Sequence, residues 1–600
     1  MAKTSAMAEA ASWDDGSQRL YEALIRVLDS LRSEAPPQEA VYNPPKSNHD
    51  AVIQARSRAL LHLFLKARFG LISHSAREPF ITDGKYDGGI DAYYIDRPNK
   101  KMYLLQAKFR ANAKNFLSVH MTPTDLLKMD VARIMHGETT SEAGEPYNAQ
   151  IRKMQKEIKK IPDRGSYEHR VVLLGNSELL SHGDLKKLID GYPIDQLPHQ
   201  KIFNELMLPV IHGTYFTDPD LTIEINLDKL NSKNASLDYD VSATGVDANI
   251  NVFFAPTKEI GRIMSTYRNS ILAFNPRSFL ELTKNRVNRE IEASLRNSDG
   301  NDFAMFNNGI TLIADRTGVS SNTATKKRAQ VVVTNPQLVN GGQTAYTLAR
   351  IYDEGNHSIF KGKEVLIKVV SIEPKKSKAR ARLKLIKDIS RASNSQTKID
   401  EADRRSNDQV QLDLQAALFE KYGLYYERKR GEFSDGVRDG YIGEKDIINR
   451  ENLVRVSLAA SYRSAQTKSG VEKFFKEPAF SSTLKVSEVG RYAFGYQVLR
   501  YLAEEKAKVK GDRWQQKKYG QALRYGEFAV VGVCVNLGAG SGSSPSDVAV
   551  RILSQWKSFE AMVSGKKSNA SYASGQNLDG VSYYKGATVD DDLKSFGFVI

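Results

Sequence analysis

The chain has 600 residues, of which 41% are hydrophobic and 26% are charged. A chain of this length exceeds one compact core, so we expect two to four globular domains and exclude wholesale disorder. The formal net charge of +15 favours a polyanionic partner, because Lys and Arg gain affinity from phosphates by releasing counterions. The single cysteine, Cys534, excludes an internal disulfide framework and a multi-cysteine metal site.

Neither end of the chain nor its interior predicts a membrane segment. The N-terminal stretch MAKTSAMAEAASWDDGSQRL lacks the apolar run of a secretion signal. The longest apolar candidate, FAVVGVCVNLG from Phe528, has about half of the roughly 20 residues that a membrane span needs. We therefore expect a cytoplasmic protein with no membrane partner, in which this candidate is a buried element.

The first 45 residues predict one helix and a linker. Apolar residues recur at helical spacing between about residues 17 and 32 (Leu20, Leu24, Val27, Leu28 and Leu31). Prolines in APPQEAVYNPPKSNHD then interrupt the helical pattern. A second helix is predicted to begin at Asp50, its expected N-cap, and to end at Gly70.

Residues 46–245 predict a mixed α/β domain. DAYYID and MYLLQAKF are expected to form a hairpin, HRVVLLGNSELL a buried strand and LTIEINL an exposed strand. Residues 246–500 combine helices with strands that end in Asn and Gly, and residues 501–600 form a helical and loop-rich C-terminal part. The expected fold class is a multidomain α/β protein: a mixed sheet flanked by helices, an α+β region and a largely helical C-terminal part.

The predicted hairpin combines residue types that bind a divalent cation and act on a phosphodiester. Gln106 and Lys108 lie two apart on one strand, so their side chains point to one face, and Asp91 opens the paired strand. Carboxylate and carbonyl oxygens suit Mg²⁺, and a lysine orients water or stabilises a pentavalent transition state. Gly88 and Gly89 are expected to let the backbone approach a phosphate. A structural interpretation stays open, because hairpins with Asp and Lys are common.

The stretch DGGIDAYYID…MYLLQAKF resembles the active-site hairpin of the PD-(D/E)xK, or restriction-endonuclease-like, superfamily in its QxK variant. The resemblance implies that Asp91, Gln106 and Lys108 are catalytic. It implies that Asp91 and Gln106 bind Mg²⁺ or Mn²⁺. From their position before the hairpin, Asp87 and Asp83 are expected to add a second carboxylate to the metal site. The expected substrate is DNA, with RNA as the alternative.

One departure from the superfamily concerns the upstream acid. Many such nucleases carry an acidic residue on the helix before the hairpin, where this chain offers Gln54. A metal site without that acid is expected either to be weaker or to recruit Asp87 or Glu78 instead.

Two Asn- and Gly-rich segments follow in the second half. AMFNNGITLIAD and NPQLVNGGQTAYTL place Asn and Gly at strand ends, where they commonly form turns. A Gly-Gly turn at a helix N-terminus also makes an anion nest. The candidate ligand loops are therefore Asn307, Asn308, Gly309, Asn340, Gly341, Gly342, Gln343 and Thr344.

Six ordered motifs resemble the abortive infection phage resistance (AIPR) family between about residues 250 and 480. They are NPRSFLEL, RVNREI, FAMFNNGITLIAD, NPQLVNGGQTAYTL, NSQTKIDEADRRSND and YYERKRGEF. The resemblance implies a role in bacterial antiviral defence. A homodimer and a further defence protein are the protein partners that we consider.

Two basic segments are candidate nucleic-acid contacts. The helix KARARLKLIKDISRASNSQTK presents Arg380, Lys384 and Lys387 opposite an apolar face. YYERKRGEF combines tyrosine rings with three cations (Arg428, Lys429 and Arg430). A solvated helix face is the structural alternative for the first segment.

Two alternatives to a metal-dependent nuclease stay open. Arg56 and His62 fit the loose spacing of the HEPN class of metal-independent ribonucleases. The other alternative is a sensor that binds a nucleotide or phage component and carries an inactive hairpin.

Overall fold

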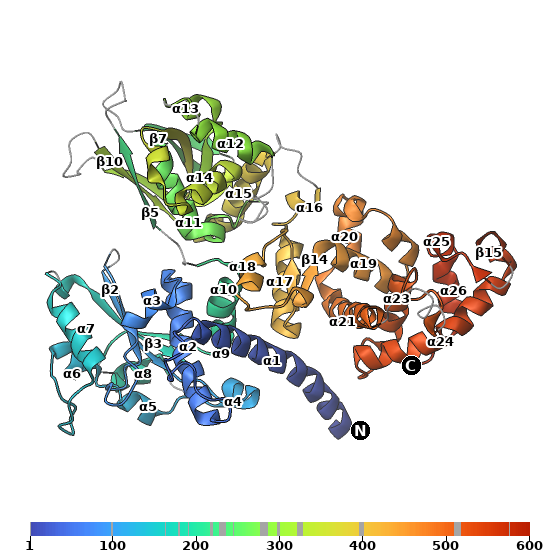
Figure 1. The fold of residues 1–600 in the computed structure, drawn as a ribbon, viewed down its shortest axis with the longest axis horizontal. Coiled ribbons are helices and arrows are strands. Elements are labelled where there is room, and N and C mark those ends of the chain that lie inside the picture. Colours follow the sequence, from blue (N-terminus) through green and yellow to red (C-terminus); the bar gives the residue numbers. More distant parts are fainter. Residues whose placement is uncertain are drawn as a thin grey trace.

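The computed structural model describes residues 2–97, 100–162, 164–177, 181–189, 191–215, 220–226, 236–243, 245–275, 286–296, 300–320, 328–394, 401–508, 518–574 and 577–600. Figure 1 shows two sheet-containing bodies, one above the other, and a helical C-terminal part to one side. The expected fold class is confirmed by this arrangement of mixed sheets followed by helices.

The N-terminal body is built on one mixed sheet with the strand order β1-β2-β3-β4. Strand β2 pairs antiparallel with β1 and parallel with β3, and β3 pairs parallel with β4. The strands are β1 (Ala92–Asp96), β2 (Lys101–Ala107), β3 (Glu168–Leu174) and β4 (Ile194–Leu197). The predicted hairpin and the predicted buried strand are therefore present.

Helices cover both faces of this sheet, because alternate residues of β2 belong to different cores. Leu105 packs against α1 and α2, whereas Leu104 packs against α5, α6 and α7. These helices are α1 (Ala2–Ser33), α2 (His49–Phe69), α5 (Pro123–Leu127), α6 (Val131–His136) and α7 (Ala149–Lys159). The short α3 (His74–Arg77) and α4 (Ala113–Ser118) join the first face.

The ends of α2 follow from local chemistry and correct one expectation. The side chain of Asn48, not that of Asp50, caps the helix, because it accepts a hydrogen bond from the backbone N–H of Ala51. Gly70 ends the helix in the left-handed conformation at φ 62°, as expected. The proline-rich segment before α2 is no free linker, because Tyr42 within it is fully buried.

The second body holds two sheets, with the orders β5-β10-β9 and β11-β8-β12-β7-β6. Their strands are β5 (Asp220–Asn226), β6 (Leu237–Ala243), β7 (Val246–Pro256), β8 (Ile310–Ala314), β9 (Arg316–Ser320), β10 (Arg328–Thr334), β11 (Gln337–Asn340) and β12 (Glu364–Ser371). Because β5 and β6 pair with later strands, the expected boundary at residue 245 is too late: this body begins by residue 220.

Helices α11 (Thr257–Tyr267) and α14 (Gly342–Asp353) pack together on the second body, with α12 (Arg286–Arg296), α13 (Phe303–Phe306) and α15 (Ala379–Asn394) around them. Val331 of β10 and Leu348 of α14 share one core. A separate small core lies under α15, which buries Ile386.

The C-terminal part is mainly helical. Its longer helices are α17 (Gln409–Tyr422), α19 (Arg450–Ala460), α21 (Val489–Ala507), α23 (Glu527–Gly538) and α24 (Pro545–Gly565), with α16 (Glu401–Arg404), α18 (Ser434–Arg438) and α26 (Val589–Phe596) as shorter ones. The apolar candidate around Phe528 is the buried α23, as expected. In the part of the chain that the structure describes, no helix has the length and apolar character to span a bilayer.

The segment around α17 and α18 connects this helical part to the N-terminal body. Strands β13 (Tyr425–Glu427) and β14 (Ile447–Asn449) pair parallel there. Phe419, Tyr425 and Phe433 belong to the same core as α1 and α2. Residues more than 300 positions apart therefore share one hydrophobic core, and the N-terminal body is stabilised from outside its own sequence.

Candidate metal-dependent active site

The hairpin brings Asp91, Gln106 and Lys108 to one face of the sheet. The register of β1 on β2 pairs Ala92 with Leu105, which places the preceding Asp91 opposite Gln106. Just beyond the regular register, the backbone N–H of Asp91 donates to the carbonyl of Leu105 at 2.8 Å, and Ala107 N–H donates to Asp91 Oδ2 at 2.7 Å, so Asp91 is held beside residues 105–107. Directly opposite residues of an antiparallel pair share a face, and so does Lys108, two positions after Gln106.

Asp91 belongs to a cluster of three carboxylates. Oxygen atoms of Asp83, Asp87 and Asp91 lie within 4.8 Å of one another. Arg58 of α2 forms an ion pair with Asp83 at 2.8 Å, so the preceding helix supplies a cation in place of the usual acid. Asp87 accepts hydrogen bonds from the backbone N–H groups of Gly84 and Gly89. Asp83 and Asp87, in the loop before β1, thus lie close enough to Asp91 to share a cation with it.

The cluster is short of positive charge. Burial raises the pKa of Asp91 to about 8, and the nearby carboxylates of Asp83 and Asp87 add to the rise, while a hydrogen bond from Ala107 and the charge of Lys108 oppose it. Burial also raises the pKa of Asp87. Two carboxyl groups with raised pKa values in one cluster indicate a site that gains stability from a bound cation.

Gln106 offers a buried amide oxygen on the strand that pairs with β1. Its side chain is buried, and its Nε2 donates to the backbone carbonyl of Asp125 at 3.1 Å. Its Oε1 is buried without a hydrogen-bond partner among the described residues. Leaving a buried carbonyl oxygen unpaired costs about 1–3 kcal/mol, which a cation ligand would offset. The donor set of carboxylates and an amide oxygen fits Mg²⁺ or Mn²⁺.

Lys108 lies at the open side of the cluster. Its ammonium is 3.5 Å from Asp125 Oδ1, and its side chain is 38% exposed. Its backbone N–H donates to the carbonyl of Leu174 on β3, which holds the end of β2 in place. Asp125 also caps α5 in a capping box with Thr122. The sequence motif TPTD indicates that cap but gives no sign that Asp125 contacts Lys108 and Gln106.

The double glycine before Asp91 serves packing, which corrects the expectation of an approach to phosphate. Gly88 and Gly89 have φ values of 61° and 72°, in the left-handed region. A Cβ on Gly89 would lie 2.6 Å from the carbonyl oxygen of Lys128, and one on Gly88 would lie 2.7 Å from Ile134 Cδ1. The glycines therefore allow close packing against the segment around α6.

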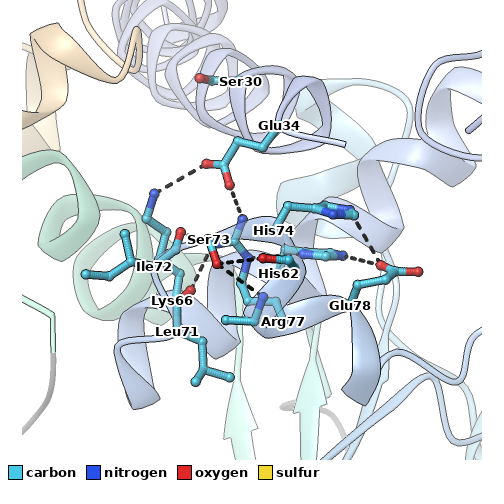
Figure 2. A network of polar contacts seen from close by, with 12 residues as sticks. Ser30, Glu34, His62, Lys66, Leu71, Ile72, Ser73, His74, Arg77 and Glu78 are labelled. Carbon is cyan, nitrogen blue, oxygen red and sulfur yellow. Dashed lines mark hydrogen bonds and ion pairs between the residues drawn. The ribbon is translucent and has the colours of Figure 1, made fainter. Parts of the chain in front are cut away.

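A second polar cluster lies beside α2 and contains His62, His74 and Glu78 (Figure 2). The Nε2 atoms of His62 and His74 are 3.3 and 3.6 Å from Glu78 Oε2. His62 is 1% exposed, and burial lowers its pKa to about 4, so the ring is neutral. Glu78 is therefore engaged here and does not replace the upstream acid.

The hydrogen bonds of His62 argue against a metal ligand. Arg77 Nε donates to His62 Nδ1 at 3.1 Å, so the proton of the neutral ring is on Nε2. His62 Nε2 is 2.7 Å from the hydroxyl of Tyr42, which in turn donates to Glu78. The chain of donors from Arg77 to Glu78 is complete without a metal. The nitrogen nearest to Glu78 has no lone pair to offer.

The same geometry removes the basis of the HEPN alternative. Arg56 forms an ion pair with Asp29 at 2.8 Å, on another side of α2, while His62 is enclosed. A general base must reach the proton that it abstracts, and neither residue faces a common open site. The spacing of the two residues reflects two separate structural contacts.

The two Asn- and Gly-rich loops lie side by side. Asn307 Nδ2 donates to Thr344 Oγ1 at 3.0 Å. Gly309 and Gly341 approach closely, because a Cβ on Gly341 would lie 2.6 Å from the carbonyl oxygen of Gly309. Gly341 caps α14, and its N–H donates to Asn340 Oδ1. Asn308 is exposed, Gly342 and Thr344 are buried and Gln343 is half-buried. These contacts explain the motif as a structural junction between β8, β11 and α14.

The junction between the two loops lies in a part of the chain that matches a known protein family. Residues 272–524 match the model of the family described as AIPR protein. This match supports the AIPR resemblance, and that family implies a role in abortive infection and defence against phage. The candidate metal site lies outside the matched residues, which we call the AIPR region. No curated protein and no solved structure matches the chain.

Two of the predicted nucleic-acid contacts in the AIPR region are structural. Arg428 is 8% exposed and forms an ion pair with Glu432 at 2.5 Å. Lys429 is buried, and its Nζ donates to the carbonyls of Leu272 and Ala273. The rings of Tyr425 and Tyr426 are buried as well, so they offer no stacking surface. The expectation for Arg428 and Lys429 is therefore wrong.

The remaining predicted contacts are accessible. Arg430, Arg380 and Lys384 are exposed, and Lys387 is half-buried. The last three line a concave surface on α15. Leu383, expected on the apolar face, lines the same surface.

Proposed function

We propose that the chain is a metal-dependent nuclease acting in anti-phage defence, with its active site on the β1–β2 hairpin. The observation that carries the proposal is the buried Oε1 of Gln106, which has no hydrogen-bond partner among the described residues, on the strand whose end binds the carboxylate of Asp91 through Ala107 N–H. This amide oxygen and the three clustered carboxylates of Asp83, Asp87 and Asp91 are the types of donor atom that a divalent cation binds.

Asp91 and Gln106 would hold the cation, and Asp87 or Asp83 would complete the set of protein ligands. A bound Mg²⁺ or Mn²⁺ supplies charge neutralisation at a phosphodiester and lowers the pKa of a coordinated water. The carboxylate of Asp91 is held in a fixed orientation, because Ala107 N–H donates to its Oδ2 at 2.7 Å. Arg58 fixes Asp83 from behind, through its guanidinium contacts with both the carboxylate and the backbone carbonyl.

Lys108 would contact the phosphate that enters the site. Its ammonium is partly exposed, and its ion pair among the described residues is with Asp125, a contact of 3.5 Å that a phosphate oxygen can replace. An ammonium placed where negative charge develops stabilises the transition state of phosphoryl transfer. We propose DNA as the substrate from the PD-(D/E)xK resemblance, with RNA as the alternative.

Cleavage of supercoiled plasmid and of RNA with Mg²⁺, Mn²⁺ or EDTA tests this proposal. We expect the wild type to cut plasmid only with a divalent cation, and Asp91→Ala and Lys108→Ala to be inactive. Asp96→Ala and Lys101→Ala change the same residue types at the far end of the hairpin and should cut like the wild type. Equal cleavage by all variants would refute the site. No cleavage by the wild type would favour the sensor alternative.

A further inference from the structure

The structure contains a basic cleft that the proposed active site does not use. Its volume is about 980 Å³, and residues of α15 and of the segment from α16 to Gln409 line it. Figure 1 shows α15 in the upper body, whereas β2 and β3 of the candidate nuclease site lie in the lower body. The cleft is therefore a separate feature of the AIPR region.

One face of α15 presents a row of cations to this cleft. Arg380, Lys384, Lys387 and Arg391 follow one another at intervals of three or four residues and all line the cleft. None of the four has an ion pair or hydrogen bond among the described residues. Over these positions the helix rises by about 16 Å, so the row is a linear array of positive charge.

The remaining cation of α15 is ion-paired, and so is the lysine that directly precedes the helix. Arg382 forms an ion pair with Asp315 and also donates to the carbonyl of Ile372. Lys378 lies 3.8 Å from Asp247. On α15, the cation outside the cleft lining is therefore paired, whereas the four that line the cleft have no ion pair among the described residues. A merely solvated helix face gives no reason for this division.

The opposite wall of the cleft carries two further arginines, both in ion pairs. Arg404 and Arg405 line the cleft, the first 3.6 Å from Glu401 and the second 3.0 Å from Asp408. Asp388 and Asp408 are the acidic residues among the described lining. Because Arg404 and Arg405 are already ion-paired, the positive excess of this concave space comes from the four cations of α15, and that excess concentrates an anionic ligand.

A smaller cavity of about 210 Å³ adjoins the cleft and shares Phe274, Leu383 and Lys387 with it. His212 also lines this cavity, and its buried Nε2 has no hydrogen-bond partner among the described residues. Burial lowers the pKa of His212 to about 4, so the ring is neutral. An aromatic ring, an aliphatic side chain and an unused ring nitrogen suit a nucleobase.

We propose that this cleft binds a stretch of single-stranded nucleic acid, with successive phosphates along α15 and one base in the adjoining cavity. The linear row suits a chain of phosphates better than one compact anion. The ligand-sized volume of the cleft suits one strand better than a duplex, which a broad surface would accommodate. The binding does not depend on cleavage by the hairpin.

Fluorescence anisotropy with the full-length chain tests this inference. The probe is a labelled single-stranded oligonucleotide of about 12 residues, a length within known single-strand site sizes. The Asp91→Ala background and EDTA prevent cleavage. The test variant combines Arg380→Gln, Lys384→Gln and Lys387→Gln. The control combines Lys258→Gln, Lys361→Gln and Lys368→Gln, which remove equal charge at exposed positions outside the cleft.

We expect the test variant to bind the strand at least about tenfold more weakly than the control, and its log–log salt slope to fall by about 2. Equal weakening by both variants, or no binding by the parent protein, would overturn the inference. ATP serves as a competitor. If ATP displaces the oligonucleotide and binds as tightly as the oligonucleotide does, the ligand is a mononucleotide and the inference of a bound strand is overturned. Loss of plasmid cleavage in Asp91→Ala with retained strand binding separates this site from the proposed nuclease.

Discussion

Asp91 and Ala107 are joined across the hairpin by a hydrogen bond of 2.7 Å from the backbone N–H of Ala107 to Asp91 Oδ2. This bond orients the carboxylate and occupies one of its oxygens. The other oxygen has no hydrogen-bond partner within the described part of the chain and is available to a cation. The backbone of β2 thus prepares Asp91 for its proposed role, and the predictions below follow from that arrangement.

Replacing Asp91 with Asn should abolish metal-dependent cleavage while keeping the fold. Asn retains an oxygen that accepts from Ala107 N–H but loses the charge that binds the cation. We expect plasmid cleavage to fall by at least about 100-fold, because metal ligation supplies several kcal/mol to the transition state. A thermal shift with Mn²⁺ should be present in the wild type and absent in Asp91→Asn. A metal-induced shift of equal size in both would contradict the assignment.

The raised pKa of Asp91 predicts a pH dependence of both stability and metal affinity. Between its ordinary pKa of about 4 and its folded pKa of about 8, the folded protein retains a proton that the unfolded chain has released. The free energy of unfolding should therefore fall as pH rises through this window. Asp91→Asn should flatten that slope, which denaturant unfolding in EDTA at several pH values measures.

Metal affinity should change in the opposite direction. A cation must displace the proton of Asp91, so the apparent association constant should rise up to about tenfold per pH unit until about pH 8. Titration calorimetry with Mg²⁺ should also detect proton release. An affinity that is constant from pH 5.5 to 8 would contradict a role for this carboxyl group.

Variants of Gln106 test whether its side chain is a metal ligand or a structural amide. Gln106→Glu restores an acidic ligand and should strengthen Mn²⁺ binding, while Gln106→Leu should weaken it by about 10- to 100-fold. In the absence of metal, Gln106→Glu should be the less stable of the two variants, because its new carboxylate is repelled by those of Asp83, Asp87 and Asp91. Calorimetry measures the Mn²⁺ affinities of the two variants, and thermal unfolding in EDTA measures their stabilities without metal. The same order of stability with and without metal would contradict the proposal.

The cluster around His62 should be structural. His62→Gln should lower the free energy of unfolding by about 1–3 kcal/mol, because Arg77 Nε and the hydroxyl of Tyr42 lose their buried partner. Arg56→Gln should affect stability only through the half-buried Asp29. RNA cleavage that survives EDTA and is lost in His62→Gln would instead support the HEPN chemistry.

Arg428 should stabilise the AIPR region and contribute nothing directly to nucleic-acid binding. Arg428→Met leaves the buried Glu432 unpaired and should cost about 3–5 kcal/mol of unfolding free energy. The double variant Arg428→Met/Glu432→Met should recover much of that loss. Arg430→Met, at the exposed neighbour, should change stability by less than about 0.5 kcal/mol. Chemical denaturation measures all three.

The sequence predicts those elements whose pattern is local. The alternation in MYLLQAKF and the glycine at the end of α2 depend on residues within one strand or helix, so β2 and Gly70 are found as expected. The shared face of Asp91, Gln106 and Lys108 likewise follows from strand geometry alone.

Contacts between distant segments are beyond local patterns. Asp125 reaches Lys108 through a helix that no periodicity links to the hairpin, and Arg58 reaches Asp83 across the loop before β1. Arg428 and Arg380 both belong to basic segments. Arg428 is buried in an ion pair with Glu432, whereas Arg380 lines a cleft. Composition cannot distinguish a buried ion pair from an open phosphate site, because both require the same residue.

The position of a bound cation tests the central claim most directly. Crystals grown with Mn²⁺ and measured for anomalous scattering should show a peak bonded to a carboxylate oxygen of Asp91 and to Gln106 Oε1, at the roughly 2.1 Å expected for such hard cations. A peak between His62, His74 and Glu78, or none at the hairpin under conditions that support cleavage, would contradict the account.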